Sequence, residues 1–203
     1  MDRRTLLTNY AAPLAPPLAA RDMKAATAAA GARANYFPNC ELQTHEGKTV
    51  RFYDDLVHGD KIVLFNFMYA QCQGICPGMT ANLVRVQKLL GARVGRDIFM
   101  HSITLKPEED KPADLKMYVE MHGVKAGWLF LTGQRDDIEV LRRKLGFRDP
   151  NPTFDKDVSQ HIGLVRFGNE AIDRWAACPA LANPEQIAKS VLWMQSANPR
   201  SGS

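Results

Sequence analysis

The sequence predicts a single α/β domain with a mixed central sheet flanked by helices. From residue 62 onward, apolar β-branched segments alternate with amphipathic segments, which indicates parallel strands joined by helices. One strand pair precedes this alternation and a second pair follows it, which predicts an N-terminal hairpin extension and a C-terminal antiparallel hairpin. The length of 203 residues suits one domain with a tail rather than two domains.

The first elements of the domain are a hairpin and a buried strand. Residues 42–52 predict a short hairpin that turns at Glu46-Gly47 and lies at a sheet edge. Residues 62–68 are almost continuously apolar, as in a strand that is buried on both faces. Two cysteines, Cys72 and Cys76, follow the carboxyl end of this strand, where α/β sheets bind their ligands.

Three helices and two further strands are predicted next. Pro77 suits the first turn of a helix that ends near Gly91, and its apolar residues recur with helical spacing. The same patterns predict strands at 98–105 and 128–131 and helices at 112–122 and 136–145.

The last elements are a hairpin and a helix. His161 opens a strand at 162–167, Gly168-Asn169 is predicted to turn the chain, and 170–175 form the returning strand. Asn183 is suited to cap a final helix, with Pro184 in its first turn. The resulting order, βαβαβαββα, predicts a thioredoxin-like fold.

Composition excludes several classes of protein. Apolar residues make up 45% and charged residues 24% of the chain, as in ordinary globular proteins. The formal net charge of +4 is spread along the chain without a dense basic stripe, so we expect no nucleic-acid partner. No stretch approaches the roughly 18 apolar residues of a membrane-spanning helix, and four scattered cysteines do not make a disulfide scaffold.

The N-terminal residues predict an exported chain. Arg3 and Arg4 precede a leucine pair and an Ala- and Pro-rich stretch, which resembles a twin-arginine export signal. Ala32-Arg33-Ala34 suits cleavage before Asn35, and residues 28–30 are a second choice; a disordered Ala/Pro leader is the alternative. We therefore expect a leader at 1–34, a domain at 35–197, a polar tail at 198–203 and a periplasmic location.

The cysteine pair predicts a reactive site. Residues four positions apart share a face of a helix, so at a helix entrance Cys72 and Cys76 can lie side by side. A helix N-terminus favours the thiolate, which binds metals and exchanges disulfides. Gly74 between the cysteines and Pro77 after them indicate exposed, activated sulfur rather than core packing.

Several separated motifs resemble the SCO/SenC family of copper-binding thioredoxin-fold proteins. The resemblance covers about residues 36–194. Its motifs are NFMY at 66–69 leading into Cys72-x-x-x-Cys76-Pro77, SITLKPEED at 102–110, GWLFLTG at 127–133 and DKDVSQH at 155–161.

The resemblance implies that Cys72, Cys76 and His161 bind one copper ion. Thiolates select Cu(I), and imidazole suits copper in either oxidation state. Many family members carry an acidic residue directly before the histidine, whereas this chain has Gln160. Asp155 or Asp157 is close enough in sequence to supply a carboxylate that orients the imidazole.

The family resemblance implies a function in copper-centre assembly. We expect an exported metallochaperone that delivers copper to, or reduces the thiols of, the dinuclear copper centre of a respiratory oxidase subunit or a related copper enzyme. Its other expected partner is a thiol reductant protein, and membrane association is expected only through a partner. The alternative is an enzyme, a thiol-disulfide oxidoreductase or thiol peroxidase, in which Cys72 and Cys76 form a redox-active disulfide pair. A redox or copper sensor with the same site is a third reading.

The remaining candidate residues are expected to be structural. Cys40 and Cys178 match no family ligand and are read as isolated thiols, and Cys40 lacks the context of a lipoprotein signal. Residues expected mainly in the core are Met68, Met79, Met100, Met117, Met121, Trp128 and Trp175, and those expected to be structural or exposed are His45, His58, His101 and His122.

Overall fold

The computed structural model describes residues 33–157 and 163–195. The strands are β1 (Glu41–Thr44), β2 (Thr49–Arg51), β3 (Ile62–Met68), β4 (Ile98–Thr104), β5 (Trp128–Gly133), β6 (Leu164–Asn169) and β7 (Arg174–Pro179). The α-helices are α2 (Ile75–Leu90), α3 (Pro112–Met121), α4 (Arg135–Lys144), α5 (Pro152–Lys156) and α6 (Pro184–Leu192), and the shorter helices are η1 (Phe52–Val57), η2 (Gly91–Arg93) and η4 (Glu170–Ile172). Almost all of the predicted leader and the whole polar tail lie outside the described residues, so the predicted domain limits remain predictions.

The described strands form one mixed sheet in the order β2-β1-β5-β4-β3-β6-β7. β4 pairs in parallel with both β3 and β5. β6 and β7 extend the sheet antiparallel on one side, and β1 and β2 do so on the other. The predicted α/β class, its parallel centre and its antiparallel additions are confirmed.

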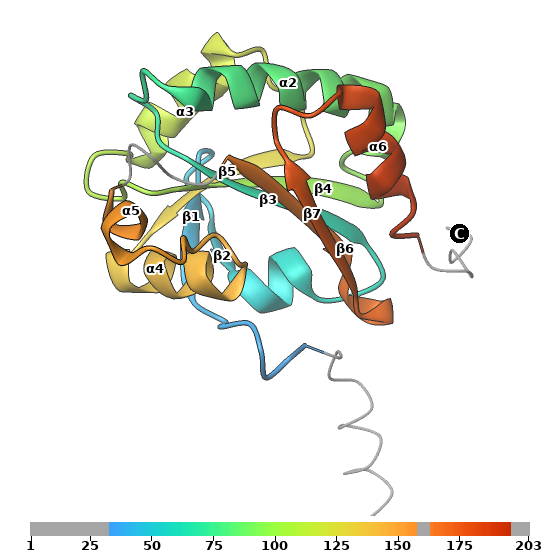
Figure 1. The fold of residues 1–203 in the computed structure, drawn as a ribbon, viewed down its shortest axis with the longest axis horizontal. Coiled ribbons are helices and arrows are strands. Elements are labelled where there is room, and N and C mark those ends of the chain that lie inside the picture. Colours follow the sequence, from blue (N-terminus) through green and yellow to red (C-terminus); the bar gives the residue numbers. More distant parts are fainter. Residues whose placement is uncertain (1–32, 158–162, 196–203) are drawn as a thin grey trace, which may run out of the picture. The chain divides into compact units, whose positions relative to one another are not determined.

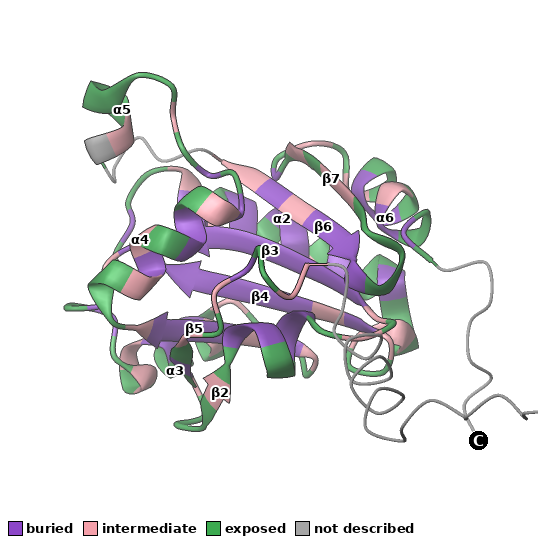
Figure 2. Cartoon of the chain, turned by 90° about the horizontal axis from the view of Figure 1, so that it is seen from below, coloured by how far each residue is buried: buried purple, intermediate pink, exposed green. Residues whose placement is uncertain are grey.

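Helices cover both faces of this sheet. α2, α3 and α6 lie on one face, and α4 and η1 lie on the other (Figure 1). Each face contributes to its own apolar cluster, one packed beneath α2 and the other around η1 and α4. Figure 2 shows the central strands as a continuous buried layer between the two.

β3 is an interior strand that is buried on both faces, as its composition predicts. Each of its residues is buried, since β4 and β6 flank it and helices cover both of its faces. α2 follows after a short loop, with Pro77 in its first turn and Gly91 at its C-cap with a φ of 60°. At α6 the Asn183 side chain accepts hydrogen bonds from the N–H groups of Glu185 and Gln186, as predicted.

The turn of the second hairpin was predicted at the wrong place. Gly168 and Asn169 belong to β6, and the chain reverses instead through η4 and Asp173, which has a left-handed φ of 46°. Gly168 is required for packing, because a Cβ atom there would lie 2.4 Å from the ring of Trp175. A Gly-Asn pair that usually marks a turn therefore marks a close approach between strands here.

The helical segments η1 and α5 are among those that were not predicted. η1 is a π-helix that buries Phe52, Tyr53, Leu56 and Val57, and its single turn is too short to show a helical period. The sequence did contain a signal for the start of α5, the pair Asn151-Pro152. The Asn151 side chain accepts a hydrogen bond from the Thr153 N–H, and Pro152 occupies the first turn.

The methionines divide into two groups. Met68, Met79 and Met100 are buried as expected, whereas Met117 and Met121 on α3 are 59% and 79% exposed, so the core expectation was wrong for these two.

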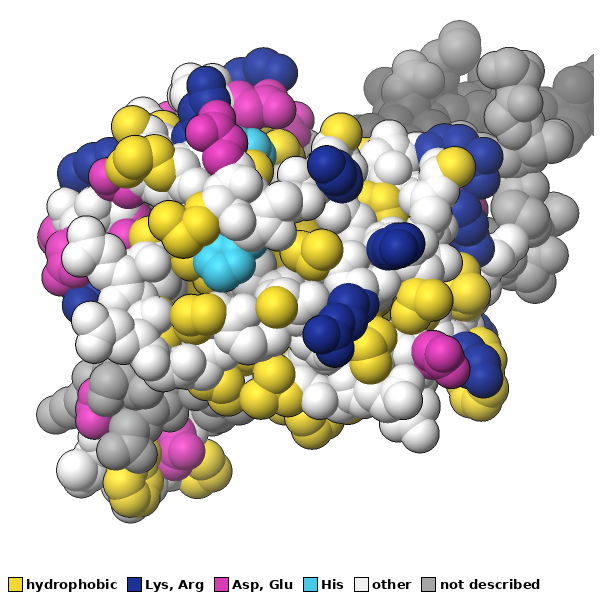
Figure 3. All heavy atoms as spheres, turned by 90° about the horizontal axis from the view of Figure 1, so that it is seen from above, with side chains coloured by type: hydrophobic (Ala, Val, Ile, Leu, Met, Phe, Trp, Pro, Cys, Tyr) yellow, Lys and Arg dark blue, Asp and Glu magenta, His cyan; other side chains and the backbone are white. Residues whose placement is uncertain are grey.

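On the face covered by α2, α3 and α6, exposed hydrophobic side chains lie among separate Lys and Arg side chains (Figure 3). Within residues 33–157 and 163–195, no helix has the length and hydrophobicity needed to cross a membrane.

His101 is a fully buried histidine in the core on β4. Its ring lies 5.1 Å from the ring of Phe65, and neither ring nitrogen has a hydrogen-bond partner among the described residues. Burial, with a smaller contribution from the charge of Lys61, lowers the pKa of His101 to about 3. The folded domain therefore holds this imidazole in its neutral form.

We predict that His101→Leu reduces the acid sensitivity of the fold. An exposed histidine in the unfolded chain titrates near about 6.5. Below that pH the unfolded state binds a proton that the folded state excludes until about pH 3, so His101 lowers stability as the pH falls. Between pH 7 and pH 5 the variant should lose about 2 kcal/mol less unfolding free energy than wild type, measured by urea denaturation. His122→Leu, at a partly exposed site, should change this slope less; equal slopes for wild type and His101→Leu would contradict the prediction.

Candidate metal centre

The two cysteines lie where β3 passes into α2. Cys72 belongs to the loop before the helix, and Cys76 is the second residue of α2. Both cysteines are reduced, with no disulfide between them. Cys72 is 6% exposed and Cys76 is 0% exposed, and both belong to the apolar cluster beneath α2. The site is therefore a buried dithiol at the carboxyl end of the interior strand β3.

Two details of the predicted site were wrong. The sulfur atoms were expected to be exposed, but the loop folds back so that both pack into the core. They were also expected to share a helix face, yet only Cys76 lies in α2. A turn brings Cys72 to its partner instead, with its N–H donating to the Tyr69 carbonyl at 3.3 Å.

Hydrogen bonds make the two thiols unequal. Burial raises the pKa of Cys72, but hydrogen bonds from the Cys76 thiol, the Cys76 and Gly74 N–H groups and the Tyr69 hydroxyl outweigh it, so the pKa lies below its ordinary value. Burial, together with the hydrogen bond to Cys72, raises the pKa of Cys76 to about 12. The structure thus makes Cys72 the more acidic of the two thiols.

Tyr69 and Asp110 are contacts of this loop that were not singled out from the sequence. The hydrogen bond to Cys72 is the main reason that the pKa of Tyr69 rises to about 12. Lys106 places its Nζ 4.8 Å from the centre of the Tyr69 ring, and Asp110 accepts a hydrogen bond from the Ala70 N–H at 3.0 Å. Their positions, just after the ends of the neighbouring strands β3 and β4, are the signal that identifies them.

The chain after His161 packs against the same end of α2. His161 itself and Gln160 lie outside the described residues. Two positions later, a Cβ atom on Gly163 would lie 2.6 Å from Cδ1 of Ile75 and 3.3 Å from Sδ of Met79. Gly163 therefore passes directly beside the first turns of the helix that carries Cys76.

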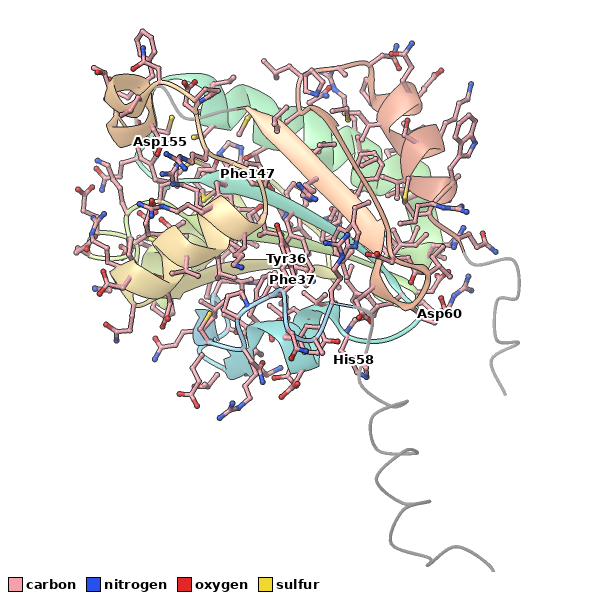
Figure 4. All side chains as sticks on the ribbon, turned by 60° about the horizontal axis from the view of Figure 1, so that its bottom comes forward. Tyr36, Phe37, His58, Asp60, Phe147 and Asp155 are labelled. Atoms are coloured by element: carbon pink, nitrogen blue, oxygen red, sulfur yellow. The ribbon has the colours of Figure 1, made fainter. Side chains whose placement is uncertain are left out.

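Asp155 interacts with an arginine. Its two carboxylate oxygens accept hydrogen bonds from both terminal nitrogens of Arg142 at 2.6 and 2.9 Å, and Arg142 also donates to the Phe147 carbonyl. The hydrogen bonds of this partly buried ion pair lower the pKa of Asp155 to about 2. Figure 4 shows Asp155 and Phe147 in neighbouring parts of this region. Asp155 thus anchors α5 to α4. Its predicted contact with the imidazole involves His161, which lies outside the described residues, and remains a prediction.

The other candidate ligands stay separate. Cys40 and Cys178 are partly exposed free thiols, as the reading of isolated thiols predicted. In the part of the chain that the structure describes, no three His, Cys, Asp or Glu residues lie close enough to hold a metal ion. The described residues thus bring together Cys72 and Cys76 from the predicted ligand set, and the contribution of His161 remains a prediction.

Known structures share this fold. The structure of Bradyrhizobium japonicum ScoI with copper bound is 22% identical, with a TM-score of 0.60, and the match covers 76% of this chain and 96% of that chain. A structure of BsSco, described as a member of the Sco family of cytochrome c oxidase assembly proteins with a disulfide switch, is 24% identical, with a TM-score of 0.61 and coverage of 76% and 90%. These similarities confirm the thioredoxin-like fold.

Sequence comparison identifies the family. The SCO1 protein homolog of Bacillus subtilis (strain 168) is 35% identical over 105 residues, which are 51% of this chain and 52% of that protein. The match thus spans about half the length of this curated relative. The model of the SCO1/SenC family matches residues 28–194. The match covers the described domain with both cysteines, and the chain therefore belongs to the SCO1/SenC family.

Proposed function

We propose that this protein binds one copper ion as cargo through Cys72, Cys76 and His161 and delivers it during assembly of the dinuclear copper centre of a respiratory oxidase. The observation that carries the proposal is the buried dithiol at the start of α2, in which Cys72 is stabilised as a thiolate. The same dithiol can instead reduce the cysteines of the client before copper enters.

The chemistry of the donor set fits copper. Cu(I) is soft and selects thiolates, and low-coordinate sites of two thiolates and one imidazole suit it. The pKa of Cys72 is lowered, whereas burial and a hydrogen bond with Cys72 raise the pKa of Cys76 to about 12. Copper binding requires both thiolates and would release the proton of Cys76, so affinity should rise with pH.

Chain connectivity supports His161 as the third ligand. Gly163 lies against Ile75 and Met79 at the start of α2. Two residues of extended chain span at most about 7 Å, and this short connection from Gly163 to position 161 supports the proposal that His161 is the third ligand.

The client is inferred from related proteins. Bradyrhizobium japonicum ScoI has been solved with copper bound, and BsSco is described as a member of a family of cytochrome c oxidase assembly proteins. We extend these properties to this chain. Delivery would proceed by ligand exchange, in which cysteines of the client replace Cys72 and Cys76 around the ion, and a thiol reductant protein would restore the dithiol if it oxidises. Contact with a membrane would come through the client.

The unequal thiols favour thiol-disulfide exchange as a second candidate function. The Cys72 thiolate would attack one sulfur of a substrate disulfide and release the other as a thiolate. Cys76 would then pass its proton to the released substrate thiolate, attack the sulfur of Cys72, form the Cys72–Cys76 disulfide and release the second substrate sulfur as a thiolate. Two electrons and the proton of Cys76 pass to the substrate in this sequence.

We predict that the reduced domain binds one equivalent of Cu(I) tightly. The test is an anaerobic titration against a competing chelator. Cys72→Ser or Cys76→Ser should weaken binding by about 100-fold or more because each removes a soft ligand, and His161→Ala should weaken it by about tenfold. The control variant carries Cys40→Ser and Cys178→Ser and should bind as wild type does. A wild-type protein without copper affinity that still cycles its disulfide would make the second candidate the function.

We also predict that Cys72 is alkylated before Cys76. With limiting iodoacetamide at pH 7, Cys72 in the reduced protein should be labelled at least about tenfold more than Cys76, because only the thiolate is nucleophilic. Cys72 labelling should rise as the pH approaches its lowered pKa, and Cys76 should stay unreactive until close to pH 12. Peptide mass spectrometry measures both sites, and equal labelling would show that the hydrogen bonds do not distinguish them.

We predict export with cleavage of the leader. The Arg33 N–H donates to the buried Glu170 carboxylate at 2.9 Å, and the Arg33 guanidinium pairs with Asp173. Cleavage before Asn35 removes these contacts, whereas cleavage after Ala30 keeps them, so we expect the upstream site. Cell fractionation with intact-mass measurement tests this. A shortened periplasmic form that begins near residue 31 supports both parts, and full-length protein in the cytoplasm refutes export.

A further inference from the structure

The turn that presents Cys72 is held by a contact outside the cysteine motif. Residues 69–72 form a turn closed by the hydrogen bond from the Cys72 N–H to the Tyr69 carbonyl. The Ala70 N–H, inside this turn, donates to Oδ2 of Asp110 at 3.0 Å. Asp110 comes from the loop after β4, so it joins the cysteine loop to a separate part of the sheet edge.

Asp110 is itself held rigidly. The Thr104 hydroxyl donates to the same Oδ2 atom at 2.5 Å, and the Asp110 N–H donates to the Lys106 carbonyl at 2.8 Å. Thr104 is the last residue of β4, and its hydroxyl also accepts from the Lys106 N–H at 2.9 Å. The carboxylate oxygen therefore lies at a position determined by the sheet.

The burial of this carboxylate is costly for stability alone. Asp110 is 2% exposed, and among the described residues no Lys, Arg or His side chain forms an ion pair with it. A buried carboxylate without a cation is less favourable than an apolar side chain of similar size. The acidic residue at this position is therefore better explained by a role other than packing in the core.

We propose that Asp110 is a positioning residue of the dithiol site: its carboxylate holds the Ala70 N–H and thereby fixes the turn that places the Cys72 sulfur beside Cys76. For copper this inference rests on the proposed function, but the placement of the two thiols is independent of the metal. Positioning contacts outside the ligand set commonly change metal affinity by about 10- to 100-fold when they are removed.

The chain offers a matched control in Glu170. This carboxylate is equally buried, at 1% exposure, and likewise accepts a backbone N–H, from Arg33, and a hydroxyl, from Tyr53 at 3.1 Å. It follows β6 directly, at the end where β6 pairs with the start of β3, whereas the cysteines follow the other end of β3. Figure 4 marks His58 and Asp60, which belong to this opposite end of the domain. Replacement of Glu170 therefore reproduces the loss of stability that follows from removing a buried, hydrogen-bonded carboxylate, without disturbing the cysteine loop.

The experiment compares wild type with Asp110→Ala, Asp110→Asn and Glu170→Ala in three measurements. These are the equilibrium of the Cys72–Cys76 disulfide with reduced and oxidised dithiothreitol, the Cu(I) affinity and the urea midpoint. In the exchange, two electrons and two protons pass between dithiothreitol and the protein. We expect Asp110→Ala to shift the equilibrium about tenfold toward the disulfide. The hydrogen bond from the Ala70 N–H to Asp110 stabilises the reduced form, whereas the covalent bond of the disulfide holds the two sulfur atoms together without it. Its Cu(I) affinity should fall about tenfold.

The other variants separate positioning from folding. Asp110→Asn keeps an acceptor oxygen and should stay near wild type in both thiol measurements. Glu170→Ala should lower the urea midpoint while both thiol measurements stay unchanged. If Asp110→Ala loses stability and leaves the dithiol equilibrium unchanged, the residue is only structural and the proposal is wrong. If Asp110→Ala does not fold, Thr104→Val, which removes the second contact to the carboxylate, takes its place with the same expected direction. If wild type binds no copper, the proposed function fails, and the copper-free exchange equilibrium still decides the role of Asp110.

Discussion

The parallel pairing of β3 with β4 is the constraint on which the thiol site depends. The two strands are in register from Ile62 opposite Ile98 to Met68 opposite Thr104, and the Leu105 N–H continues the pairing to the Met68 carbonyl. Because parallel strands end at the same edge of a sheet, the loop with Cys72 and the loop with Asp110 begin side by side. An acceptor that follows β4 can therefore orient a turn that follows β3, although 40 residues separate Asp110 from Ala70.

Burial determines how the two cysteines react. In an environment of low dielectric constant, a hydrogen bond to sulfur has a larger effect than in water, so a few donors suffice to distinguish two otherwise identical thiols. Cys72 receives several such donors, while Cys76 supplies one and keeps its own proton. The residues beside the cysteines, Gln71, Gln73 and Gly74, are exposed and carry no charge.

Helices and strands could be predicted wherever the local pattern of apolar residues matches the burial of those residues in the fold. Residues 62–68 are apolar throughout and form the strand that is covered on both faces, and Pro77 with Gly91 delimits α2 closely. The errors have physical causes. Gly168 supports contact with Trp175 rather than a turn, Met117 lies on an exposed face of a short helix, and η1 is a single π-helical turn without a period that a sequence pattern can show.

The sequence by itself determined the fold class, the family and the two thiols, because these depend on the spacing of residues along the chain. The tertiary structure alone decided that the sulfur atoms are buried, that Cys72 reaches Cys76 through a turn, and that Asp155 binds Arg142. It also decided that Asp110 contacts the cysteine loop. Apart from the local turn at 69–72, these features arise between segments that are separated in sequence, where hydrogen-bond geometry and the exclusion of water depend on how the sheet brings loops together.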